Sequence, residues 1–216
     1  MANPKIATIL RTLSSPNNAF REIYENGNYY FKHSVFILLI ASFFILTLTN
    51  LRSSEEGLIP TNEIGYILDP KLQALDFGYN ILLNFLYVVI IFYVCKKLRG
   101  GSYFKKMFSV VSCSFIPSII GGAIAHIFLF FPSLVIAEGV SSKSAGSVYL
   151  LLIYFGIFLP FSVWSLILSI KAIKIANNFG TAKAFGILIL ANIITILVLL
   201  PLEIYLNLTG NSFLKF

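Results

Sequence analysis

The sequence predicts an all-α fold: a polytopic membrane helix bundle with five transmembrane helices, a cytosolic N-terminus and a short amphipathic interfacial segment before the first span. Hydrophobic residues make up 57% of the 216 residues, whereas charged residues make up only 12%. The apolar residues gather in five long runs that carry almost no charge, which lipid tolerates and a soluble surface does not. Lys and Arg lie almost entirely on one side of these runs, and this positive-inside bias predicts the direction of insertion.

Residues 1–32 form the predicted cytosolic N-terminal segment. Asn3-Pro4 and Ser15-Pro16 each place a capping residue before a proline, which is typical of a helix start. Apolar residues repeat at helical spacing behind each proline, so we expect two amphipathic helices along the inner leaflet. Two ordinary capped helices of a cytosolic tail explain the same pattern equally well.

The membrane domain covers residues 33–216. Its five spans are predicted at approximately residues 33–51, 78–95, 115–137, 147–170 and 184–206. A run of nineteen residues reaches about 28 Å at the helical rise, close to one hydrocarbon thickness. Twelve of the sixteen Lys and Arg residues lie in the N-terminal segment and in the connections after the second and fourth spans. These parts are therefore assigned to the cytosol.

The third apolar run is too long for one straight crossing, because it extends from Met107 to Ala137. A proline, Pro117, lies inside it. We predict that residues 103–114 lie partly in the membrane interface and that the span bends near Pro117. Continuous tilt of a straight helix is the alternative.

Four further residues are expected to shape the bundle. Gly121 and Gly122 each have a small residue four positions away, a spacing that lets helices approach closely. Pro160 predicts a kink in the fourth span, where neighbouring helices can satisfy the freed carbonyl. Trp164 lies near the centre of that span, so its indole N–H needs a partner and we expect it to point into the bundle.

Three polar residues within the spans are candidates for a functional site. His126 lies near the middle of the third span, and Asn80 and Asn84 share one face of the second. The functional interpretation is a polar cavity or ligand contact inside the membrane. The structural interpretation is a hydrogen bond between neighbouring helices, which is the more frequent role of such residues.

Composition disfavours catalysis. The carboxylates lie in loops or at span ends, and no pair is placed for acid–base work or metal binding. Cys95 and Cys113 both map to the inner halves of spans and form no metal-binding pattern, so neither a disulfide nor a metal is expected. We expect no catalytic residue and no cofactor. The net charge of +7 sits at span ends and does not indicate nucleic-acid binding.

Several stretches, taken in order, carry a family resemblance. They are Leu13-Ser-Ser-Pro16-Asn-Asn-Ala-Phe20-Arg-Glu-Ile23, Lys96-Lys-Leu-Arg-Gly100-Gly101-Ser-Tyr-Phe-Lys105, Phe115-Ile-Pro117, Val163-Trp164-Ser-Leu-Ile-Leu and Lys171-Ala-Ile-Lys-Ile-Ala-Asn-Asn-Phe-Gly180-Thr-Ala-Lys-Ala184. Together they resemble the Yip family, the Ypt/Rab-interacting membrane proteins, and especially its short prokaryotic members. The resemblance implies five spans, a cytosolic N-terminus and the cell membrane of a prokaryote. The eukaryotic branch is linked to small GTPases, but this N-terminal tail is short and lacks an acidic Leu-Tyr-Gly-Pro-like motif.

The function expected from these observations is that of a non-enzymatic integral membrane protein that organises the bilayer or binds a partner. Its expected partners are membrane lipids and a protein on the cytosolic face. The sequence leaves open whether the protein forms a homo-oligomer. The alternative is a small-solute or lipid transporter with a cavity between bent spans three and four, lined by His126 and Asn84. An accessory subunit of a larger complex is a third interpretation.

Overall fold

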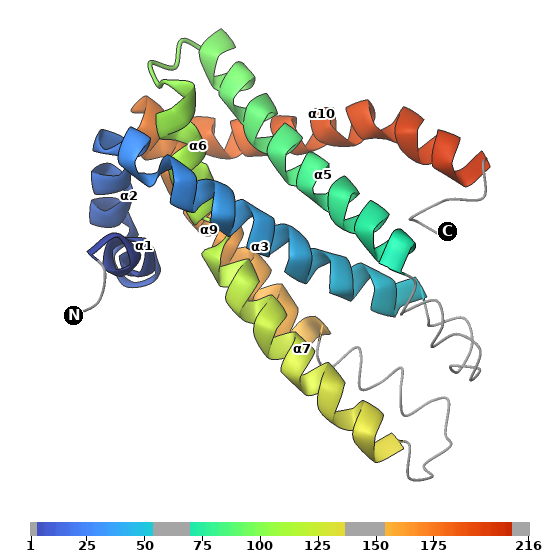
Figure 1. The fold of residues 1–216 in the computed structure, drawn as a ribbon. Coiled ribbons are helices and arrows are strands. Elements are labelled where there is room, and N and C mark those ends of the chain that lie inside the picture. Colours follow the sequence, from blue (N-terminus) through green and yellow to red (C-terminus); the bar gives the residue numbers. More distant parts are fainter. Residues whose placement is uncertain (1–3, 54–69, 137–153, 209–216) are drawn as a thin grey trace.

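The computed structural model describes residues 4–53, 70–136 and 154–208, and every regular element in these ranges is a helix (Figure 1). The predicted all-α fold class is confirmed for this part of the chain. Four helical segments are long and apolar enough to cross a membrane: Phe77–Lys97, Phe104–Ala125, Gly156–Asn177 and Thr181–Pro201. They correspond to the predicted second to fifth spans, although the third begins earlier than expected.

Two short helices precede the first long one. Helices α1 (Pro4–Ser14) and α2 (Pro16–Glu25) each begin at a proline, whose fixed φ suits the first helical turn. After α2, the Nδ2 of Asn26 donates to the Glu22 carbonyl oxygen at 3.1 Å and satisfies a helix-end acceptor. Helix α3 (Gly27–Ser53) follows directly and contains the predicted first span.

The other elements of the described ranges are, in chain order, α5 (Pro70–Lys97), α6 (Phe104–Cys113), α7 (Ile116–Ile136), the π-helical turn η2 (Tyr154–Phe158), α9 (Leu159–Asn177) and α10 (Thr181–Leu208). Figure 1 shows the axes of α3, α5 and α7 roughly aligned, with α5 running opposite to α3 and α7, while α10 crosses them at a wide angle. The α5–α6 and α9–α10 connections lie at the same end of the bundle as α1 and α2. Parts of the chain that are far apart in sequence therefore meet at this end.

The third apolar run consists of two helices. Helix α6 ends at Cys113 and α7 begins at Ile116, so the predicted bend near Pro117 is confirmed and a single straight, tilted helix is excluded. Every side chain from Met107 to Cys113 is buried. That residues 103–114 lie partly in the membrane interface stays a prediction. Helices α2, α3, α5 and α9 surround α6. The part of α6 from Met107 to Cys113 is therefore covered by protein, whereas Lys105 near its start is exposed.

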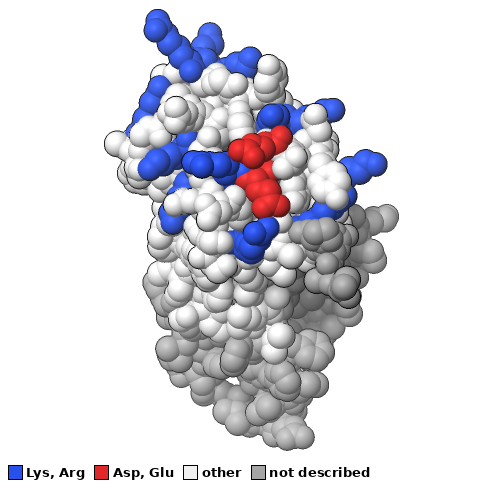
Figure 2. Space-filling model, turned by 90° about the vertical axis from the view of Figure 1, so that its left-hand side faces the viewer, with Lys and Arg blue, Asp and Glu red and all other residues white. Residues whose placement is uncertain are grey.

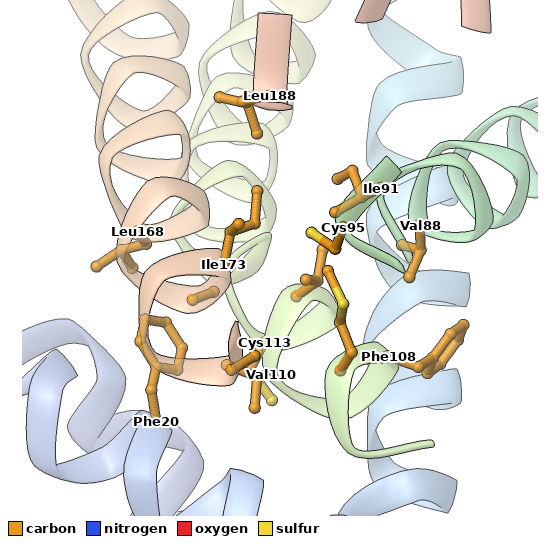
Figure 3. Packing of buried hydrophobic residues seen from close by; sticks show 14 of the residues in the cluster. Phe20, Val88, Ile91, Cys95, Phe108, Val110, Cys113, Leu168, Ile173 and Leu188 are labelled. Carbon is orange, nitrogen blue, oxygen red and sulfur yellow. The ribbon is translucent and has the colours of Figure 1, made fainter. Parts of the chain in front are cut away.

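The hydrophobic core lies where α6 meets these surrounding helices. Phe20, Phe108 and Ile173 are among its fully buried side chains (Figure 3). Large apolar side chains on the outer faces are exposed instead, for example Ile196 at 64% and Leu197 at 60% on α10. A closed interior inside an exposed apolar shell is the arrangement that a lipid surrounding requires.

Candidate functional site: the basic end of the bundle

Basic side chains gather at the end of the molecule that carries the short helices and the two connections (Figure 2). We call this region the basic end; its residues are Lys5, Arg11, Arg21, Lys32, Lys96, Lys97, Arg99, Lys105, Lys106, Lys171, Lys174 and Lys183. Figure 2 shows acidic side chains in the middle of this basic surface. The charge asymmetry read from the sequence is thus a spatial feature of the fold, and it gives this end a strongly positive potential.

Helix α2 is fixed to the bundle by its apolar face. Phe20 and Ile23 are both 0% exposed, and α2 packs against α6 and α9. Figure 3 shows Phe20 pointing from α2 toward Leu168 and Ile173 of α9. The apolar face of α2, which we predicted to lie along the inner leaflet, is therefore covered by protein.

A single carboxylate joins the first three helices. Glu22 of α2 accepts from the Thr8 hydroxyl at 2.7 Å and from Nη2 of Arg11 at 2.8 Å, both on α1. The Tyr30 hydroxyl of α3 donates to the same carboxylate at 3.3 Å. Burial raises the pKa of Tyr30 above its ordinary value, so the phenol stays a neutral donor across the physiological range. Glu22 therefore holds α1 in one orientation.

The outward face of α1 remains apolar and exposed. Ile6 and Leu10, four residues apart, are 50% and 52% exposed. Lys5 lies beside them, with its Nζ 3.6 Å from the ring centroid of Tyr29 on α3. This cation–π contact adds a second tie between α1 and α3. The exposed apolar face is consequently presented on a helix that is held in place.

The two basic connections are tied to each other. The Ser102 hydroxyl donates to Oδ1 of Asn177, at the end of α9, at 2.8 Å. The Asn177 Nδ2 in turn donates to the Ile173 carbonyl oxygen at 3.2 Å. From α10, Nζ of Lys183 donates to the Leu98 carbonyl oxygen at 2.9 Å. These bonds fix the end of α5 relative to α9 and α10.

The end of α5 requires a left-handed residue. Arg99 has a φ of 64°, and the Gly100 N–H donates to the Cys95 carbonyl oxygen at 2.7 Å. This is the geometry of a helix C-cap in which glycine is the favoured left-handed residue. The next residue, Gly100, has to be glycine for a different reason: a Cβ there would collide with the side chain of Asn177.

Replacing Arg99 by Gly is expected to stabilise the protein by about 1 kcal/mol relative to Arg99→Ala, since glycine removes the left-handed strain. Arg99→Ala is the matched control, because it removes the same charge but keeps a Cβ. Thermal unfolding in detergent measures both variants. Equal melting temperatures for the two would contradict this account of the cap.

Four serines join the break in the third apolar run to α9. The hydroxyl oxygen of Ser165 accepts from the Ser118 N–H at 3.0 Å and from the Ser118 hydroxyl at 2.7 Å. One turn closer to the basic end, the hydroxyls of Ser114 and Ser169 lie 2.7 Å apart. The first N–H groups of a helix have no partner inside the helix. Ser165 therefore acts as an N-cap supplied by another helix.

Substituting Ser165 by Ala is expected to lower the free energy of unfolding by about 1–2 kcal/mol, because the Ser118 N–H then loses its acceptor. Chemical unfolding in mixed micelles measures this effect. Ser14→Ala, at an exposed position of α1, is the control and should change stability by less than about 0.5 kcal/mol. A Ser165→Ala protein as stable as the control would refute the capping role.

The structure brings two of the three predicted polar residues together at Ser42. Asn84 is buried, and its Nδ2 donates to the Ser42 hydroxyl of α3 at 3.0 Å, which is the expected interhelical bond. Asn80 is also buried, and its backbone carbonyl oxygen accepts from the Ser42 hydroxyl at 3.4 Å. His126 lies on α7, but its side chain is outside the described residues. Asn80 and Asn84 thus join α5 to α3.

The predicted packing residues have different outcomes. Gly121 allows α7 and α9 to touch, since a Cβ there would lie 2.5 Å from the Cβ of Phe161, and Gly122 is buried beside it. Pro160 is the second residue of α9 and follows the π-helical turn η2 directly. The predicted kink in the fourth span thus has a local cause at this point, since π turns bend helices. Trp164, which we predicted to point into the bundle, is 37% exposed and stacks on Phe161.

Sequence reasoning missed the residues that organise the basic end, namely Glu22, Ser102, Asn177 and Ser165. Each of them falls within or next to a stretch that carried the family resemblance. Their roles depend on partners far away in the chain: Ser102 and Asn177, for example, are 75 positions apart. The sequence does show that small and amide residues recur in these stretches, but it does not show which residues they contact.

Comparison with known proteins adds one finding. The family model of the Yip1 domain matches residues 10–202, from α1 to α10. No curated protein and no solved structure matches the chain. The matched range includes both connections of the basic end, the end of α1 and all of α2.

Proposed function

This chain belongs to the Yip1 domain family, and from that premise we propose that it is a non-enzymatic scaffold that binds a partner protein at its basic end. It is a multi-pass membrane protein, as the family and the four long apolar helices show. The proposed location is the cell membrane of a prokaryote, as in the short members that it resembles. The proposal assigns the basic end to the cytosol.

The proposed topology has five crossings. Helix α3, α5, the α6–α7 pair, the η2–α9 pair and α10 would cross in alternating directions. This order returns the chain to the basic end after α5 and after α9, in agreement with the connections seen in Figure 1. Translocating these basic connections would oppose the charge bias, which supports a cytosolic N-terminus.

The observation that carries the scaffold proposal is the exposed apolar face of α1. Ile6 and Leu10 lie on a helix too short to span a bilayer, so the spanning requirement does not explain their exposure. Lys5 and Arg11 flank them, and exposed apolar patches with a polar rim mark interaction sites. The tie through Glu22 pre-orients this face, which lowers the entropic cost of binding.

The double substitution Ile6→Ser and Leu10→Ser is expected to lower recovery of the partner from native membranes at least tenfold, because two central apolar contacts are lost. Quantitative mass spectrometry after cross-linking and co-purification measures the recovery. Leu98→Ser is the matched control, since Leu98 is also an exposed apolar residue (41%) at the basic end. An unchanged set of partners in the double variant would argue against the proposal.

The described contacts favour the scaffold over the alternative of transport. Asn84 is engaged with Ser42 on α3 and does not face α9. Helices α7 and α9 touch directly at Gly121 and Phe161, where the transporter alternative placed its cavity. Hydroxyls of both helices bond to each other, as Ser118 does to Ser165. This use of polar groups supports a structural, non-catalytic bundle.

A further inference from the structure

A groove lies at the basic end between the start of α3 and the start of α6. It has a volume of about 520 Å³ and is lined by Asn28, Tyr103, Phe104, Lys105 and Lys106. This volume lies within the range of small-molecule sites. The groove is separate from the exposed face of α1 and from the ties between the connections, and the proposed scaffold function does not use it.

The walls of the groove are mainly apolar and combine aromatic rings with the stems of two lysines. Tyr103 is 73% exposed, and the stems of both lysines are apolar. The Lys105 Nζ is 5.9 Å from the ring centroid of Phe31, and the Lys106 Nζ is 5.3 Å from that of Tyr24. Neither lysine makes an ion pair within the described part of the chain. Both positive charges are therefore available to an anion.

The groove lies at the depth where the helices enter the apolar layer. Phe104 is the first residue of the segment Phe104–Ala125, which is long and apolar enough to cross a membrane. Asn28 is the second residue of α3, just before the predicted first span. Aromatic and basic residues at such a boundary lie at the level of lipid headgroups.

Close packing fixes the two sides of the groove relative to each other. A Cβ on Gly27 would lie 2.6 Å from the Cα of Lys106, so the backbones of α3 and α6 are in contact there. The Ser109 hydroxyl donates to the Gly27 carbonyl oxygen at 3.0 Å and holds the same pair together. The groove is consequently preformed, and a ligand does not need to order its walls.

We propose that this groove binds the headgroup and glycerol region of an anionic phospholipid. The two lysines contact the phosphate, and the amide of Asn28 donates to a phosphate or headgroup oxygen. Tyr103 and Phe104 contact the glycerol and the first methylene groups. Charge selects an anion, while the mainly apolar walls and the boundary position select a lipid over a soluble ion. The proposal is independent of the protein that α1 binds.

The test is native mass spectrometry of the full-length protein titrated with phosphatidylglycerol or with phosphatidylcholine of the same acyl chains. We expect phosphatidylglycerol to bind Lys105→Gln/Lys106→Gln at least about tenfold more weakly than the unsubstituted protein. Phosphatidylcholine binding should stay unchanged. Lys96→Gln/Lys97→Gln is the matched control, because it removes the same charge from the same end and should keep its affinity within about twofold.

Two further arms separate the site from its alternatives. Tyr103→Ser keeps both lysines and should weaken phosphatidylglycerol binding about threefold, because the apolar wall is shortened. Soluble glycerol phosphate at equal concentration should not displace the lipid.

Equal phosphatidylglycerol affinity in the Lys105/Lys106 variant, or an equal loss in the Lys96/Lys97 control, would overturn the proposal. Displacement by glycerol phosphate or by an acidic peptide would overturn the lipid assignment. Matching melting temperatures establish that the variants are folded.

Discussion

Replacing Phe20 by Ala is expected to lower the free energy of unfolding by about 3–5 kcal/mol and to detach the N-terminal helices from the bundle. Phe20 is 0% exposed, and it fills the space between α2, α6 and α9. Truncation leaves a cavity at a junction of three helices, which cannot collapse without moving one of them. Limited proteolysis within residues 4–26 and chemical unfolding in micelles measure the two effects.

The control for this prediction is Phe36→Ala on α3. Phe36 is 62% exposed, so its truncation leaves no interior cavity and should cost less than about 1 kcal/mol in detergent. Equal stability of the two variants would show that α2 is not part of the core. In that case α2 would be free to lie on the inner leaflet, as its sequence pattern also allows.

The substitution Gly27→Val is expected to destabilise the protein by about 3 kcal/mol. A side chain at this position meets the Lys106 backbone at 2.6 Å, and a backbone atom cannot move aside as a flexible side-chain end can. Helices α3 and α6 would have to separate, which also breaks the bond between Ser109 and the Gly27 carbonyl. Thermal unfolding measures the loss.

Gly101→Val is the matched control for Gly27→Val. A Cβ on Gly101 has no neighbouring atom within 4 Å, and Gly101 lies in an exposed connection. Its substitution should change stability by less than about 0.5 kcal/mol. If both variants unfold at the same temperature, the close contact of α3 with α6 is not required for the fold.

Helix positions and breaks follow from the sequence because their causes are local. Pro117 lacks an N–H, and this predicts the interruption between α6 and α7. Charge asymmetry predicts which ends of the helices gather, since insertion sorts Lys and Arg irrespective of the later packing. The prolines at 4 and 16 likewise predict the starts of α1 and α2.

The environment of each face does not follow from the same patterns, because lipid and protein interior are equally apolar. An amphipathic α2 fits an inner leaflet as well as a groove of the bundle, and the buried Phe20 shows which surface it meets. The same ambiguity applies to Trp164, which is 37% exposed on α9. It also explains α6, whose apolar residues are covered by helices that are distant in sequence.

The candidate site was only partly predictable. The basic connections and their order are visible in the sequence, but the bonds from Ser102 to Asn177 and from Lys183 to Leu98 depend on the assembled fold. The sequence identifies Asn84 as a polar residue within a span. It does not indicate which of the many hydroxyl groups of the chain is its partner, and the structure shows that this partner is Ser42. Tertiary proximity decides these roles.

The central claim is that the basic end faces the cytosol and that five crossings place residues beyond α10 on the opposite side. Cysteines introduced at Asn17, Asn62 and Asn211, one per variant, can be labelled with a membrane-impermeant maleimide in intact cells. The native Cys95 and Cys113 are both 0% exposed and should not react. The account predicts labelling at positions 62 and 211, and labelling at position 17 only after permeabilisation. Labelling of positions 17 and 211 from the same side of the membrane would contradict it.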